Sequence, residues 1–164
     1  MSEPLASWSE FNVAMVGATA ALAGLLIVAM SVNIAEIMKS VTLPPRAASS
    51  IAALVLAITA AAFGLIPGQP VAVYGIEVLV AALLAGLFQL HAIRVVMRED
   101  SVSPFDRVLK SIAGVLPVAA FLGGAVLVIV GAAEAGLIAM AVGSVLSIVA
   151  ALLMAWVVLV EVLR

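Results

Sequence analysis

The sequence predicts an all-α fold, a polytopic bundle of about five transmembrane helices. Of its 164 residues, 66% are hydrophobic and 10% are charged, and the mean hydropathy is +1.39. A soluble domain is roughly half apolar and about a quarter charged, so a soluble helical bundle of this composition would have too few polar side chains to cover its surface. The apolar residues form five long runs without the alternation of a transmembrane β-strand. Each run is long enough for the roughly 20 helical residues that cross the hydrocarbon core.

The first span is expected at about residues 11–37. The residues before it include Glu3 and Glu10 but no lysine or arginine. A cleaved signal peptide begins with a basic region and continues with a shorter apolar stretch. We therefore expect this span to be retained.

The second span is expected at about residues 45–66, and the second of two consecutive prolines, Pro45, begins it. Proline suits the first turn of a helix, where its missing N–H costs little. The motif Pro67-Gly68-Gln69-Pro70 then predicts a tight turn, because proline and glycine are strong turn formers. The third span is expected directly after this turn, at about residues 71–96.

A polar loop separates the third span from the fourth. Near its end, Ser103 and Asp106 lie three residues apart and resemble a capping box, which would open a fourth span at about 105–130. A short turn at 131–134 then predicts a fifth span at about 136–163. The chain has the length of one domain, so we expect a single transmembrane domain covering 1–164.

The basic residues predict the orientation of the spans. If the N-terminus lies outside, all seven lysines and arginines fall on the cytoplasmic side and none on the outer side. This is the distribution that the positive-inside rule describes. We therefore expect an outer N-terminus and a cytoplasmic C-terminus. The seven residues are Lys39, Arg46, Arg94, Arg98, Arg107, Lys110 and Arg164.

Small residues recur three and four positions apart along the spans, most weakly in the third. Membrane helices associate through close packing of small residues, because lipid is as apolar as leucine. The pattern predicts a tight bundle, and it leaves open whether each stripe faces the same chain or a second copy. The main stripes are Gly17, Ala20, Ala21 and Gly24 in the first span; Ser49, Ala53, Ala57, Ala60 and Gly64 in the second; and Gly136, Ala139, Gly143, Ser147 and Ala150 in the fifth.

Glu77 is the strongest candidate for a functional residue, because it lies about two turns inside the third span. Ionisable groups within the membrane are costly and often line ion or substrate pathways. Glu77 could be a cation-attracting carboxylate that faces a cavity. It could equally be an acid that reaches water at the interface, or a neutral acid hydrogen-bonded to a neighbouring helix.

A second group of polar residues is expected near the cytoplasmic ends of the spans. Asn33, Glu36, Gln89, His91 and Glu161 could together form a polar inner vestibule. The alternative is that they form interhelical hydrogen bonds and solvated helix ends.

Two of these residues have simpler structural explanations. His91 shares a helical face with Glu77, but the rise of 1.5 Å per residue separates them by about 21 Å. A lone histidine also cannot hold a metal without partners. Glu36 could pair with Lys39, three positions later.

The sequence contains no recognised catalytic motif. It has no cysteine, which excludes disulfides, thiolate metal sites and haem attachment through cysteine. It has no His-Glu-x-x-His motif and no phosphate loop. We therefore expect no catalytic, cofactor or metal site. The small net charge of −2 gives no reason to expect nucleic-acid binding.

Four stretches resemble a bacterial family of small multi-pass membrane proteins that is widespread in actinobacteria. They are VGATAALAGLLIVAMSVNI at 16–34, LPPRAASS at 43–50, LIPGQP at 65–70 and WVVLVEVLR at 156–164. The resemblance implies a bacterial plasma membrane. Some members of the family are described as modulators of a membrane-bound ATP-dependent protease. The resemblance implies no catalytic or binding residue.

These observations favour a homo-oligomeric channel or a conduit for small solutes or ions. The small-residue stripes, Glu77 and the inner polar group are its basis, because rings of acidic side chains favour cations. The alternative is a non-catalytic accessory or modulatory subunit of a membrane protein complex. A secondary transporter is a weaker option, because five spans do not divide into two equal repeats.

Overall fold

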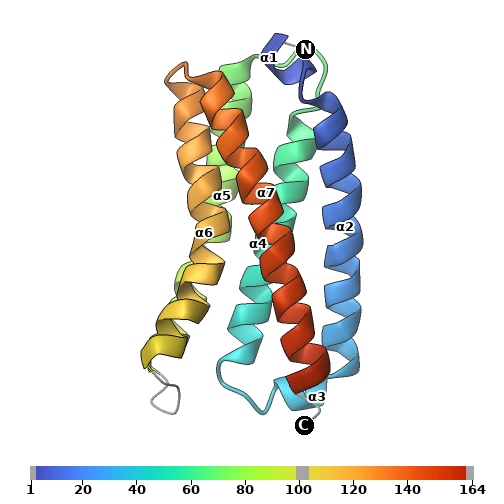
Figure 1. Ribbon diagram of the computed structural model, residues 1–164, viewed down its shortest axis with the longest axis vertical. Helices are drawn as coiled ribbons and strands as arrows, with labels where there is room; N and C mark the ends of the chain where they lie inside the picture. Colours follow the sequence, from blue (N-terminus) through green and yellow to red (C-terminus); the bar gives the residue numbers. More distant parts are fainter. Residues whose placement is uncertain (1–2, 99–103, 162–164) are drawn as a thin grey trace.

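The computed structural model describes the backbone of residues 3–98 and 104–161, and the side chains of residues 4–98 and 111–160. Within these ranges the chain is helical and contains no strand. Five helices are long and apolar enough to cross a membrane, and they lie side by side along the long axis of the molecule (Figure 1). The predicted all-α fold with five spans is confirmed, and the chain is a multi-pass membrane protein.

The helices keep close to the predicted spans, with short additions at the ends. In chain order they are α1 Glu3–Ala6, α2 Ser9–Val32, α3 Ile34–Ile37, α4 Leu43–Phe63, α5 Val71–Arg98, α6 Pro104–Ile129, α7 Ala133–Trp156 and a π-helical turn η1 Val157–Glu161. The residue Ser103 of the predicted capping box lies outside the described residues.

The first predicted span is wrong in one respect, because it breaks at Asn33. This residue has φ −107° and ψ 18°, outside the helical region, and it separates α2 from the single turn α3. Its Nδ2 donates to the Ala29 carbonyl at 3.2 Å. Asparagine favours helix ends, since its side chain offers the backbone an alternative partner.

The start of α4 shows why the double proline is tolerated there. Pro44 and Pro45 lie in the first helical turn and have no N–H to satisfy. The N–H of Leu43 donates to Ser40 Oγ at 3.3 Å, and that of Arg46 donates to the Thr42 carbonyl. The first turn of α4 is therefore satisfied locally.

Glycine brings α6 and α7 together near the predicted outer end. A Cβ added to Gly124 would lie 2.7 Å from the Gly136 carbonyl oxygen, and one added to Gly136 would lie 2.6 Å from the Gly124 carbonyl oxygen. The two backbones therefore touch at this point. Around it lies the larger buried cluster, which includes Phe121, Tyr74 and, from α1, Leu5.

The small-residue stripe of α2 has a different environment. Gly17, Ala20, Ala21 and Gly24 are all exposed. A Cβ added to either glycine would meet nothing within 4 Å. This stripe therefore does not pack inside the chain, and it faces away from the bundle.

The bundle is tighter at one end than at the other. In Figure 1, α6 and α7 lie together near α1 and diverge toward the opposite end, where α7 finishes. Pro117 is buried inside α6. Proline removes one helical hydrogen bond and favours a bend. The space between the diverging helices is where the candidate site lies.

Candidate functional site

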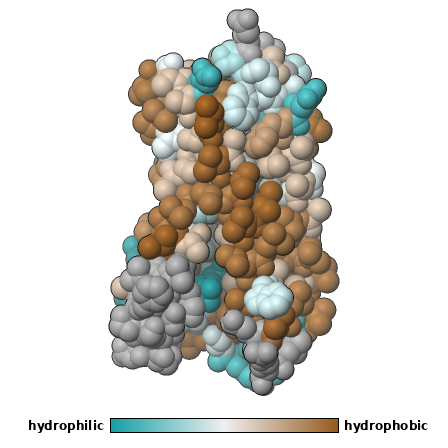
Figure 2. Space-filling model, in the orientation of Figure 1, coloured by the Kyte–Doolittle hydropathy of each residue, from teal (hydrophilic) through white to brown (hydrophobic). Residues whose placement is uncertain are grey.

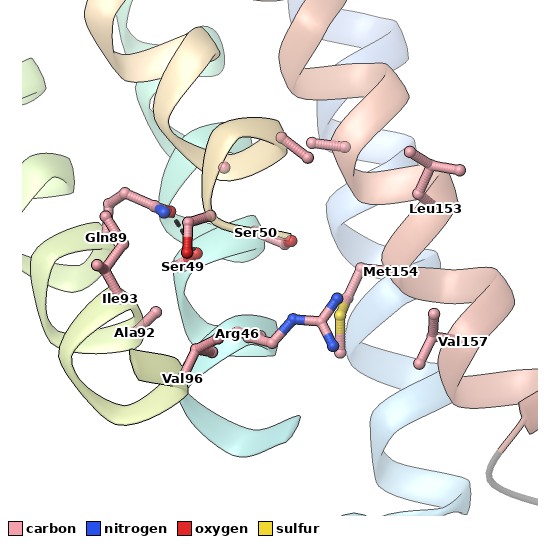
Figure 3. A pocket seen from close by; sticks show the side chains of 14 residues that line it. Arg46, Ser49, Ser50, Gln89, Ala92, Ile93, Val96, Leu153, Met154 and Val157 are labelled. Atoms are coloured by element: carbon pink, nitrogen blue, oxygen red, sulfur yellow. Dashed lines mark hydrogen bonds between the residues drawn. The ribbon is translucent and has the colours of Figure 1, made fainter. Parts of the chain in front are cut away.

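A cavity of about 420 Å³ lies between α4, α5, α6 and α7, in the half of the molecule that holds the start of α4 and the end of α5 (Figure 3). This is the predicted cytoplasmic half. The cavity is lined by Arg46, Ser49, Ser50, Gln89, Ala92, Ile93, Val96, Ser111, Ala113, Gly114, Ala150, Leu153, Met154 and Val157.

A buried hydrogen bond joins α4 to α5 on one wall of this cavity. Ser49 Oγ donates to Gln89 Oε1 at 2.8 Å, and both side chains are at most 9% exposed. On the facing helix, a Cβ added to Gly114 would lie 2.5 Å from Gln89 Oε1 and 2.6 Å from its Nε2. The absence of a side chain at Gly114 makes room for the amide.

Three further polar side chains come from α4 and α6. Figure 3 shows Arg46 extending from α4 across the cavity, with its guanidinium beside Met154 on α7. Ser50 follows on the same helix. Ser111 Oγ is buried and has no hydrogen-bond partner in the described part of the chain. The cavity thus combines a guanidinium with hydroxyl and amide groups.

The cavity opens on the side of the molecule. Figure 2 shows hydrophilic atoms recessed between α6 and α7, on a surface whose described part is otherwise mostly hydrophobic. Leu153 lines the cavity and is 56% exposed, and Ala113 is also exposed. An apolar rim therefore faces the region that lipid would occupy.

Beyond the cavity, toward the predicted outer end, the bundle is filled by side chains. Phe121, Tyr74 and Val78 are at most 2% exposed and belong to one buried cluster. Tyr74 donates from its hydroxyl to Met140 Sδ at 3.3 Å. The cavity is therefore accessible from one half of the protein and closed toward the other.

Of the five predicted candidates whose side chains the structure describes, Gln89 alone lines this cavity. His91 is exposed on another face of α5, and Asn33 is buried but bonds within its own helix. Glu36 pairs with Lys39 at 2.6 Å, and both side chains are well exposed. The side chain of Glu161 lies outside those that the structure describes.

Glu77 lies away from the cavity, near the start of α5. Gln69 Nε2 donates to the Glu77 carboxylate from the preceding turn. Gln69 itself is buried, although the sequence suggested an ordinary turn residue. This arrangement matches a hydrogen-bonded acid better than a carboxylate that faces an open cavity.

Sequence reasoning missed Arg46, Ser49, Ser50 and Ser111 as site residues. Arg46 was counted only as a cytoplasmic charge, and Ser49 only as a small packing residue. A signal was present, because positions 46, 49 and 50 are three and four apart and share one helical face. What the sequence did not indicate is that Gln89 and Ser111 face them from other helices.

A further buried polar side chain that lacks a hydrogen-bond partner lies near the predicted outer end. Asn12 is 6% exposed, and its Nδ2 has no hydrogen-bond partner among the described side chains and backbone. It borders a void of about 10 Å³ that Trp8, Tyr74 and Ser144 also line. Such a void holds about one water molecule. It is too small for a substrate.

The described polar groups in the larger cavity are a guanidinium, an amide and three hydroxyls, all of which form hydrogen bonds. Across the described residues, no three His, Cys, Asp or Glu side chains come together in a way that could hold a metal ion. Comparison of the chain with protein-family models, curated proteins and solved structures gives no match. The function is therefore inferred from the cavity itself.

Proposed function

We propose that this protein conveys a small polar or ionic solute through a bacterial plasma membrane, and that the cavity forms the inner part of the path. The observation that carries this proposal is the cavity of about 420 Å³ lined by Arg46, Ser50 and Gln89 within an apolar helical bundle. Polar groups inside membrane spans are costly and commonly mark substrate pathways. The volume lies in the range of small-molecule sites.

In this proposal the closed end of the cavity is the barrier. Phe121, Tyr74 and Val78 fill the bundle beyond the cavity. A cavity in one half of the bundle and a packed other half suit a gated conduit, in which movement of packed helices opens the closed half. Two helices contribute to both regions: α5 carries Tyr74, Val78 and Gln89, and α6 carries Phe121 and Gly114.

We further propose that the protein is a homo-oligomer in the membrane. The exposed stripe of Gly17, Ala20, Ala21 and Gly24 on α2 supports this, because small residues let helix backbones approach closely in lipid. In this proposal the path runs through each protomer. A shared pore lined by Glu77 has less support, because that carboxylate is bonded to Gln69.

The same stripe supports the alternative of an accessory or modulatory subunit, with the α2 face covered by a helix of another membrane protein. The cavity would then be a regulatory or structural site. Stoichiometric copurification of a partner from native membranes, together with no solute flux, would favour this alternative. Neither proposal assigns an enzymatic activity to the chain.

The conduit is tested by flux into liposomes that contain the purified protein. The solutes are K⁺, Cl⁻ and inorganic phosphate, each compared with protein-free liposomes. Ser50→Phe places a bulky ring in the cavity and is expected to reduce flux to the protein-free level. Thr59→Val is the control, because Thr59 Oγ1 bonds only to carbonyls of its own helix, and it is expected to conduct like the wild type. Equal flux in both variants would contradict the proposed path.

A further inference from the structure

We propose that the cavity binds an oxyanion of the phosphate type, carried by a phospholipid headgroup or by a soluble phosphate. This inference rests on the proposed function, since it names the class of solute for the same cavity. The residues that would hold the group are Arg46, Ser50, Gln89 and Ser111.

The donors in the cavity fit an oxyanion. A guanidinium presents N–H groups in a planar fork that matches phosphate oxygens. Its five N–H groups allow Arg46 to hold an oxyanion while keeping another partner. Gln89 Oε1 already accepts from Ser49, which leaves the Nε2 amide to donate. Ser50 supplies a hydroxyl proton from the same face of α4 as Arg46.

Ser111 gives independent support for a bound ligand. Its hydroxyl is buried at the cavity wall and has no hydrogen-bond partner in the described part of the chain. Buried hydroxyls are normally hydrogen-bonded, and a group without a partner requires an explanation. Rotation of the Ser111 side chain toward the cavity that this residue lines would let a ligand oxygen accept its proton.

The charged side chain described in the cavity wall has the sign that attracts an anion. The residues that line it include Arg46 and no acidic side chain among those described. Arg46 and Ser50 also lie in the first two turns of α4.

The shape of the mouth explains how a lipid could reach these groups. The hollow opens sideways between α6 and α7, on the hydrophobic surface (Figure 2). Leu153 and Ala113 form an exposed apolar rim beside it. A headgroup phosphate could enter while its acyl chains remain against this rim. A soluble phosphate would instead have to enter from the predicted cytoplasmic end of the bundle.

The test uses the full-length protein and two arms. In the first, nanodiscs contain phosphatidylglycerol and a phosphate-free glycolipid, and native mass spectrometry identifies the lipid retained by the protein. In the second, the protein is held in glycolipid alone, and binding of inorganic phosphate is titrated. Retention in the first arm identifies a lipid source, and saturable binding in the second identifies a soluble one.

Three variants show whether the cavity is responsible. We expect Arg46→Gln to weaken binding by about tenfold or more, because a charge-assisted bidentate contact is lost. Arg46→Lys keeps the charge and is expected to lose less, and Ser111→Ala removes one donor without adding bulk. Arg94→Gln is the matched control, because Arg94 is exposed on α5 and does not line the cavity.

Folded protein that retains neither phosphatidylglycerol nor phosphate would overturn this inference. Equal binding by wild type, Arg46→Gln and Ser111→Ala would also overturn it. If K⁺ or Cl⁻ flux nevertheless depends on Ser50, the conduit stands and only its solute class is wrong. If binding follows Arg46 and Ser111 but no solute crosses, the oxyanion site stands and the conduit is wrong.

Discussion

Ser49 and Gln89 show how single residues define this site. Each would be an ordinary polar residue in a soluble protein, but here their hydrogen bond joins two apolar helices at 2.8 Å. Gly114 on a third helix leaves the space that the amide occupies. Three residues from three helices therefore pack together, and we expect a substitution of one to change the contacts of the other two.

A double-mutant cycle measures this coupling. We expect Ser49→Ala and Gln89→Ala to interact by about 0.6 kcal/mol, and at most about 2 kcal/mol, as interhelical hydrogen bonds do in membranes. Reversible unfolding in mixed detergent micelles provides the free energies. Pairing Gln89→Ala with Thr59→Val, which changes a hydroxyl bonded within its own helix, should give no coupling. An additive Ser49 and Gln89 pair would mean that the hydrogen bond adds nothing to stability.

Two adjacent glycines of α6 make a second prediction at this scale. Gly124→Ala should destabilise the protein by about 1–3 kcal/mol, because the new methyl group would overlap the α7 backbone. Gly123→Ala should be neutral or slightly stabilising, since nothing lies within 4 Å of its Cβ position. Thermal unfolding of both variants in the same detergent checks this. Similar losses in both would contradict the close helix contact.

At the scale of elements, the helices were largely predictable and their neighbours were not. Long apolar runs, Pro44–Pro45 and the turn at 67–70 were sufficient to place α4 and α5, because hydropathy and proline act locally. The break at Asn33 was missed, since one asparagine barely changes the hydropathy of an apolar run. The stripe on α2 was recognised, but small residues suit any close partner, so only the structure shows that it faces outward.

The outward stripe leads to a prediction about assembly. Gly17→Leu and Gly24→Leu should each shift native mass spectra from oligomer toward monomer, because a large side chain prevents close approach of two α2 helices. Gly123→Leu is the control, since Gly123 is also exposed and open but lies on α6. If all three variants keep the oligomer of the wild type, another face forms the interface. A monomeric wild type would contradict the homo-oligomer.

The whole molecule is polarised along its long axis. One end is closed by α1 and a buried cluster, and the other diverges around a polar cavity (Figure 1). The positive-inside rule predicts that the open end is cytoplasmic. The cavity itself was not predictable from the sequence, because Arg46, Gln89 and Ser111 lie far apart along the chain. Their meeting depends on how helices cross, which periodicity does not specify.

The absence of cysteine allows a direct test of orientation. Ser7→Cys and Val41→Cys place single thiols at exposed positions near opposite ends of the bundle. In intact cells, a membrane-impermeant thiol reagent should label Ser7→Cys only. After permeabilisation it should label both, because the loop at Val41 is predicted to be cytoplasmic. The reverse pattern would show that the N-terminus is inside.

The most direct test of the proposed path is a thiol block of flux in Ser50→Cys. Ser50 lines the cavity and is only half-buried, so a charged thiol reagent attached there should obstruct it. The solute is the most permeant of K⁺, Cl⁻ and phosphate in liposomes. We predict that labelling reduces flux through Ser50→Cys to the protein-free level and leaves labelled Val41→Cys unchanged. Full flux through completely labelled Ser50→Cys would contradict the claim that the solute passes through this cavity.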